Sequence, residues 1–559
     1  MKNPGILARS HADLWFQQLA IFLRENATAA NLVGLLGGLC ALFLFVALPM
    51  PWNIRLPFYL MLLVWIILRP RVALYLMPIA VPWGSLDTLT VAGLNVNGAD
   101  ILVFMLGVSW LMSYALRPML SYDRSGAVMY DRGPRDRATT HAPKYLLFAI
   151  VALLCAMLLS MYGAISISSS LKEISKWLEF LILILVGSQY IRTRRQLWLL
   201  VVMICLAGVS QGFYGFFQAF FNLGPQSFIR DTSLRVYGTF GQPNPYAGYI
   251  NIPLSIALSL LLLGGNWMTR ILAGLTTVLL AITVYLTQSR GAEIALVSAL
   301  VFIVIVGMPH LRKLLALLVL AVVCFMELFF AGWIPTYVLT PVFRLLGTEQ
   351  ISFVAPSPQD YSTAERLAHW IAGIRMFLTH PLTGVGIGNY PDAYPSYYLT
   401  IFVNSLGHAH NYYINIAAET GTIGLIAFLL FLVAIFVAGG RAFRAVNHKY
   451  EQARALCTTA PEKVPAPLDW RNKLTLLLQP VRMVKYYRPR GIHGALTTLV
   501  NDRALAIGLL AALLSVCVHN LVDDLYVHSV TNLIALLIIA LICLPTVTVD
   551  VADDEKIRA

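Results

Sequence analysis

Long apolar runs separated by short polar connections recur along most of the chain. A helix that crosses a bilayer needs about 20 predominantly apolar residues, and the pattern predicts about 12–14 such helices. We place them at residues 30–48, 56–68, 71–83, 99–116, 144–163, 173–191, 196–220, 244–264, 268–287, 291–308, 312–331, 410–439, 504–521 and 528–546. The predicted fold class is therefore all-α, a polytopic integral membrane protein.

Composition supports this class. Hydrophobic residues make up 58% of the chain and charged residues 12%, whereas a soluble domain carries about 25% charged residues. The net charge of +13 would also suit a nucleic-acid partner. The basic residues, however, lie mostly in the short connections between apolar runs, as the positive-inside rule requires. We therefore expect the lipid bilayer, and no nucleic acid, as a partner. Seven scattered cysteines without a CxxC pair predict neither a disulfide framework nor a zinc site.

The same rule orients the chain. With fourteen spans, all strongly basic connections fall on the side of both termini, which must then be cytoplasmic. The expected location is a cell inner (plasma) membrane. The expected parts are an interfacial helix at 1–29, a transmembrane bundle at 30–200, a domain at 201–440 with an outer loop at 332–409, a basic cytoplasmic loop at 441–503, C-terminal spans at 504–548 and a cytoplasmic tail at 549–559. The outer loop should contain an amphipathic helix at 362–380.

Several cations fall on the outer side, where positive charge does not set orientation. They are Lys172, Lys176, Arg230, Arg235, Arg290, Arg344, Arg366 and Arg375. Charged groups near lipid are costly and mark functional sites. Arg235 precedes a Gly-rich turn and a helix start, with Asn244 as the predicted cap and Pro245 as the first helical residue. A guanidinium and free N–H groups there favour an anion. Arg290 stands in a turn, "SRG", and either snorkels to water or binds an anion.

The loop "HPLTGVGIGNYPDAYPSYY" at 380–398 places tyrosines near these cations. Its GxGxG spacing is a weak nucleotide signal because no strand precedes it. Its four tyrosines, of which Tyr390 is the first, would either stack on sugar rings or anchor the loop in the membrane interface.

Two histidines, His408 and His410, precede the span that begins near residue 410, with Asn411 as its predicted cap. Gly421 and Gly424 should allow close helix contact farther along it. A rigidly held histidine near several arginines would remain neutral and could act as a general base.

Three carboxylates accompany this group. Asp523 and Asp524 should lie at the outer ends of the last two spans, where they either bind acceptor hydroxyls or pair with the arginines; we favour pairing. Glu419 either supports the site from behind or forms a hydrogen bond within the structure; we favour the second.

His410-Asn411, followed after nine residues by Gly421 and after two more by Gly424, resembles the O-antigen ligase family. So do "GTFGQPN", "SRG" and "HPLTGVGIGNY", and the resemblance covers about residues 200–440. It implies a C-type membrane glycosyltransferase that is inverting, needs no metal or other cofactor and works on the outer, periplasmic face. The implied donor is an undecaprenyl-diphosphate-linked glycan. The acceptor would be a glycan, a lipid A core or a protein.

The resemblance implies that His410 is the base and that Arg235, Arg290 and Arg366 hold the donor diphosphate. His408, Asn411, Asn244, Tyr390, Asp523 and Asp524 would support them. Transfer of a whole glycan to an acceptor is the leading hypothesis. A polymerase of the same superfamily, acting in O-antigen or exopolysaccharide synthesis, and a solute transporter are the alternatives. Clustering of ionisable groups at the outer boundary rather than the bilayer midplane argues against the transporter.

Overall fold

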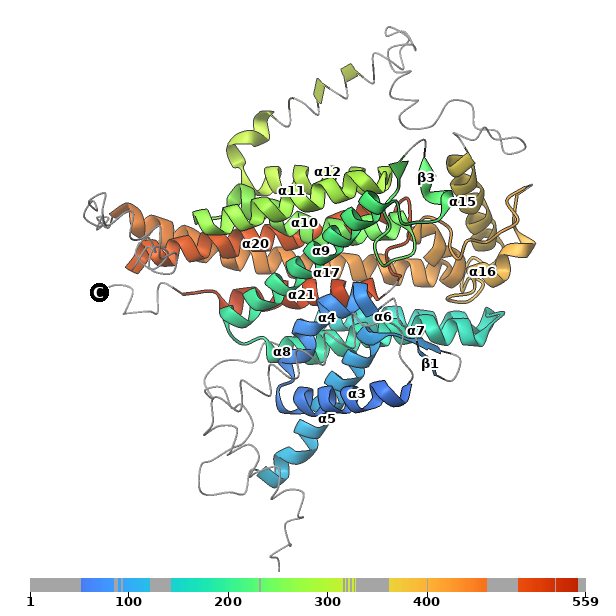
Figure 1. Cartoon of the computed structure of the whole chain (residues 1–559), viewed down its shortest axis with the longest axis horizontal. Coiled ribbons are helices and arrows are strands. Elements are labelled where there is room, and N and C mark those ends of the chain that lie inside the picture. Colours follow the sequence, from blue (N-terminus) through green and yellow to red (C-terminus); the bar gives the residue numbers. More distant parts are fainter. Residues whose placement is uncertain are drawn as a thin grey trace, which may run out of the picture.

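The computed structural model describes residues 52–84, 89–91, 94–120, 142–230, 233–314, 361–399, 401–459, 491–527 and 529–550, with scattered positions between 317 and 327. Most of them are helical, and most of the long helices run side by side along one direction (Figure 1). A helix satisfies its backbone N–H and C=O groups internally, which is what apolar sequence requires in lipid. The all-α prediction is confirmed.

The helices follow the apolar pattern. They are α3 (Trp52–Leu68), α4 (Arg71–Trp83), α5 (Gly98–Leu120), α6 (Lys144–Ser160), α7 (Ile167–Ile182), α8 (Ser188–Tyr190), α9 (Arg194–Phe221), α10 (Pro243–Leu263), α11 (Trp267–Thr287), α12 (Arg290–Gly307), α15 (Tyr361–Thr379), α16 (Tyr390–Ala393), α17 (Tyr412–Thr459), α20 (Gly491–His519) and α21 (Val530–Val547). Two short antiparallel hairpins join β1 (Leu89–Val91) to β2 (Leu94–Val96) and β3 (Ile229–Arg230) to β4 (Ser233–Leu234).

Within the described ranges, eight helices are long and apolar enough to cross a membrane, and three shorter apolar helices accompany them. Helices α10, α20 and α21 are mostly buried inside the protein, whereas α11 and α12 expose most of their apolar side chains, as lipid-facing helices do. The expected interfacial helix at 1–29, the span at 30–48 and most of the span at 312–331 lie outside the described residues.

Three helices differ from the expected bounds. The span predicted at 173–191 begins earlier, as the amphipathic α7, and continues through a π-helical turn into α8. Helices α17 and α20 both extend well into the segment expected to be a loop at 441–503. An apolar run fixes the length that can lie in lipid, but a helix can continue beyond it on polar residues with good helix propensity.

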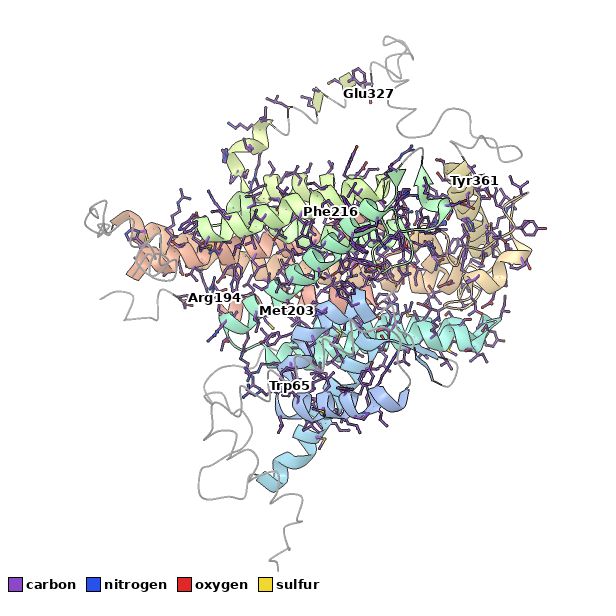
Figure 2. The ribbon with its side chains drawn as sticks, viewed as in Figure 1. Trp65, Arg194, Met203, Phe216, Glu327 and Tyr361 are labelled. Atoms are coloured by element: carbon purple, nitrogen blue, oxygen red, sulfur yellow. The ribbon has the colours of Figure 1, made fainter. Side chains whose placement is uncertain are left out.

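The basic connections gather at one end of the bundle. The Arg194 guanidinium lies 2.8 Å from the carboxylate of the fully buried Asp502, which also accepts a hydrogen bond from Trp198 Nε1 at 2.9 Å. Arg503 donates to Asn447 Oδ1 at 2.7 Å. Figure 2 shows Arg194 near this end, while Tyr361, the first residue of α15, lies at the opposite end. Helix α17 contacts both α15 and α16 (Figure 1) and packs against α20.

Candidate active site

The turn before α17 places both candidate histidines. Asn411 Oδ1 accepts hydrogen bonds from the backbone N–H groups of Tyr413 and Ile414 at 3.0 and 3.1 Å, so Asn411 is the predicted cap of α17. The N–H of Tyr412 donates to the carbonyl of Asn520 at 2.9 Å. This bond ties the first turn of α17 to the end of α20, where the two aspartates follow.

His410 is held in an unusual backbone conformation. Its φ of +51° is left-handed, which is uncommon for a residue with a side chain and is often found at functional sites. Its carbonyl accepts a hydrogen bond from Trp370 Nε1 at 3.2 Å, and its ring meets the ring of His369 edge-on at 5.4 Å. The imidazole is therefore fixed from both the backbone and the ring side.

Asp523 lies against both histidines. One carboxylate oxygen is 3.7 Å from His410 Nδ1 and 3.8 Å from His408 Nε2. These distances are slightly longer than a hydrogen bond, as is common in enzymes without substrate. Burial by itself would raise the pKa of this carboxyl, but the neighbouring His410 and His408 outweigh it and hold the pKa below its usual value. Asp523 is therefore ionised at neutral pH, and its partner is a histidine rather than the expected arginine.

The three groups are close enough to suggest a metal site, since their ligand atoms lie within 4.8 Å of one another. The hydrogen bonding of His408 argues otherwise. The N–H of His410 donates to His408 Nδ1 at 3.0 Å, so Nδ1 is an acceptor and the proton of the neutral ring is on Nε2. Nε2 faces Asp523 as a donor, whereas a metal would need its lone pair. The arrangement fits two imidazoles that donate to one carboxylate.

This arrangement leaves one nitrogen of His410 available. Burial lowers the pKa of His410, and the nearby His408 and Arg366 lower it further, although the Asp523 carboxylate opposes this shift. The ring is therefore neutral at neutral pH. With Nδ1–H directed at Asp523, Nε2 carries the lone pair that a general base uses.

Tyr390 does not reach a substrate or a membrane surface. It is fully buried, donates its hydroxyl to the carbonyl of His369 at 2.9 Å and lies beside Tyr394, which is also fully buried. Burial lowers the pKa of His369 to about 3, so this ring stays neutral behind His410. Stacking on sugar rings and anchoring in the membrane interface are therefore both wrong for these two tyrosines, which are buried in a small apolar core beside α15.

The Gly-punctuated loop is docked onto a break in α17. Gly421 has φ +64° and ψ −163°, which interrupts the helix and leaves carbonyls before it and N–H groups after it unpaired. The loop at 381–386 satisfies them: Val385 N–H donates to the Ala418 carbonyl at 3.0 Å, and Thr422 N–H donates to the Pro381 carbonyl at 2.8 Å. Gly421 thus admits a loop rather than the helix that we expected.

Glu419 lies at the same break. Its side chain is buried and accepts a hydrogen bond from the N–H of Tyr390 at 3.0 Å. The predicted structural role of Glu419 as a hydrogen-bond acceptor is confirmed.

Arg235 and Asn244 form a pair at the start of α10. Arg235 Nη2 donates to Asn244 Oδ1 at 3.0 Å, and its Nε donates to the carbonyl of Thr287 at 3.0 Å. Helix α10 begins at Pro243 with Gln242 as its cap, so the predicted cap at Asn244 was wrong. Proline lacks a backbone N–H, and the first helical turn does not need one, so Pro243 is a suitable first residue. The Asn244 side chain orients the guanidinium instead of capping the helix.

The Thr287 contact brings Arg235 to the turn that precedes Arg290. Arg290 is exposed and is the first residue of α12. A Cβ on the adjacent Gly291 would lie 2.5 Å from Val522 and 3.9 Å from His519 Nε2. The first turn of α12 therefore packs directly against the segment that carries Asp523.

Arg366 belongs to the histidine group. It is partly buried on α15, one helical turn from His369, and is close enough to act electrostatically on both His410 and His519. The structure therefore brings together His408, His410, Asp523 and Arg366, and joins them to Arg290 through Gly291.

Asp524 is hydrogen-bonded to its own backbone segment. Its carboxylate accepts a hydrogen bond from the N–H of Tyr526 at 2.8 Å, and His408 and Lys176 both act on it electrostatically. Burial raises the pKa of Asp524, and those two groups oppose that rise. Lys176 itself forms an ion pair with Glu173 at 2.6 Å. Asp524 thus stabilises the backbone of the segment that follows Asp523.

The sequence did not lead us to His369 or His519. Helical spacing offered one signal, because His369 and Arg366 are three residues apart on a predicted helix and share a face. No comparable local signal marked His519, whose neighbours come from other helices.

Comparison with known families adds one finding. Residues 275–429 match the sequence model of a family described as O-antigen ligase. The match includes Arg290, Arg366 and His410 and ends before Asp523. No curated protein matches the chain.

Proposed function

This chain carries a domain of the O-antigen ligase family, and from that premise we propose that it transfers a glycan from undecaprenyl diphosphate en bloc to an acceptor hydroxyl. The reaction would take place on the extracytoplasmic face of the inner membrane. The observation that carries the proposal is the neutral His410 seated against the ionised Asp523, with Arg366 beside it at one end of the bundle.

The geometry supports the following roles. His410 Nε2 accepts the proton of the acceptor hydroxyl while the hydroxyl oxygen forms a bond to the anomeric carbon. The bond from that carbon to the diphosphate oxygen breaks, and undecaprenyl diphosphate leaves with the bonding electrons. Attack opposite the leaving group inverts the anomeric carbon. Asp523 stabilises the imidazolium that forms.

Arginines balance the charge of the leaving group. Arg235 is oriented by Asn244 and Thr287 beside the turn of Arg290, and Arg366 lies on the side of the base. Guanidinium groups bind phosphate oxygens with two parallel hydrogen bonds and remain charged at any working pH. They provide the stabilisation that a divalent metal would otherwise supply, so the proposed reaction is metal-independent.

The test uses purified full-length protein, an undecaprenyl-diphosphate-linked glycan and candidate acceptors. We expect the wild-type protein to move the glycan to the acceptor and His410→Ala to lose about 10²–10⁴-fold in rate, the usual contribution of a general base. His448→Ala, at an exposed position near the other end of α17, is the control. Transfer by His410→Ala at the wild-type rate would remove the base assignment.

The same assay separates the two members of the superfamily. Growth of the glycan on its lipid carrier, without transfer to an acceptor, would identify a polymerase. In a strain without the gene, short surface chains would likewise indicate a polymerase, and free lipid-linked long polymer a ligase.

A further inference from the structure

His519 is a buried imidazole that lacks partners. It is the last residue of α20 and is 1% exposed, and among the described residues neither ring nitrogen has a hydrogen-bond partner. A buried polar group without a partner costs free energy, and such groups are rare unless a bound molecule completes them. The His519 side chain therefore marks a position where a polar ligand is expected.

The ring is directed at the start of α12. Nε2 lies 3.9 Å from where a Cβ on Gly291 would stand, a position that Val522 already crowds at 2.5 Å, so only a glycine allows α12 to approach this closely. The capping residue of α12, Ser289, makes no side-chain hydrogen bond to the first turn. Free N–H groups at a helix N-terminus attract anions. Arg290, the first residue of α12, adds a positive charge at the same turn.

The same ring is linked to the base. Asp523 and Arg366 are both close enough to act on it electrostatically. The backbone carbonyl of His519 also accepts a hydrogen bond from the N–H of Asp523 at 3.1 Å. His519 therefore joins the start of α12 to Asp523 of the histidine group.

We propose that His519 donates a hydrogen bond to a phosphate oxygen of the polyprenyl diphosphate, held between Arg290 and the first turn of α12. This inference rests on the proposed function. An imidazole carries at least one N–H in either charge state, so no proton needs to be transferred. Negative charge on the phosphate oxygen grows as the bond to the anomeric carbon breaks. The hydrogen bond consequently strengthens in the transition state and favours turnover as well as binding.

The experiment measures binding of undecaprenyl diphosphate, without glycan or acceptor, to the purified full chain, together with kcat for transfer. The variants are His519→Ala and His519→Gln, the second of which keeps an N–H donor. His493→Ala is the control, because His493 lies at the other end of α20 and its Nε2 is also buried without a hydrogen-bond partner in the part of the chain that the structure describes. We expect His519→Ala to weaken binding and lower kcat by about tenfold or more, as loss of a hydrogen bond to a charged group does. His519→Gln should recover part of both, and His493→Ala should match the wild type.

The outcomes separate the two proposals. Wild-type affinity and kcat in His519→Ala would overturn the role of His519 and leave the transferase proposal intact. A loss of thermal stability with unchanged affinity would also overturn it, since that is what a packing role predicts. If the wild-type protein itself failed to bind undecaprenyl diphosphate, the donor assignment and this inference would fall together. Should His519→Ala not fold, wild-type affinity together with wild-type kcat in both His519→Gln and His519→Leu would overturn the proposal.

Discussion

Replacing Asp523 with asparagine tests how the site activates His410. The substitution keeps the shape of the side chain and removes its charge. At 3.7 Å and an effective dielectric constant of about 20, a carboxylate stabilises a full imidazolium charge by about 4.5 kcal/mol. At 1.36 kcal/mol per factor of ten this is about 10³-fold in rate. Because the asparagine oxygen still accepts a hydrogen bond, we expect kcat to fall by about 10²- to 10³-fold.

The pH profile of Asp523→Asn provides a second readout. The base is active when neutral, and burial already lowers the pKa of His410 below its usual 6.5, so the acid limb of kcat/KM in the wild-type protein should lie below pH 6.5. The Asp523 carboxylate raises that pKa. Its removal should therefore move the acid limb to still lower pH while the plateau falls.

The assay follows transfer from a lipid-linked glycan between pH 4 and 9, with thermal unfolding to verify folding. Asp524→Asn removes the neighbouring charge, which faces the backbone and Lys176, and should have a smaller effect. Glu451→Gln, in an exposed ion pair near the far end of α17, should behave as the wild type. An unchanged plateau and acid limb in Asp523→Asn would refute the coupling of Asp523 to the base.

Three further predictions concern other parts of the molecule. Arg290→Ala should raise KM for the donor by about tenfold and Arg290→Lys by less, and equal losses in KM measurements would show that bidentate geometry is required. Asp502→Ala should lower the free energy of unfolding by about 3 kcal/mol, because Arg194 loses its carboxylate partner. A double variant that also removes Arg194 should recover part of this loss, as measured by thermal denaturation. Gly421→Ala should lower the free energy of unfolding by about 2 kcal/mol or more, because the φ of Gly421 is +64° and a Cβ there would collide with the backbone of the docked loop. A Cβ at Gly440 on the same helix meets nothing within 4 Å, so Gly440→Ala should not lower it, and equal melting temperatures for the two variants would contradict this interpretation.

Local sequence was sufficient for the fold class and for one part of the site. Each span is a continuous apolar run, and the length and composition of a run decide by themselves whether it suits a bilayer. The helix predicted at 362–380 is α15, and Asn411 caps α17 as expected. Caps and spans depend on residues within a few positions of one another, which is why they are readable from the chain.

Tertiary structure decided which groups meet. The pairing of Asp523 with His410, the burial of Tyr390 and the approach of His519 to Gly291 all join segments that are far apart in sequence. Their positions depend on how α12, α15, α17 and α20 pack. Periodicity tells which face of a helix is apolar, but every apolar face in a membrane protein can be covered equally well by lipid or by another helix. The neighbour of each face, and with it the chemistry of the site, is therefore fixed only when the helices have packed.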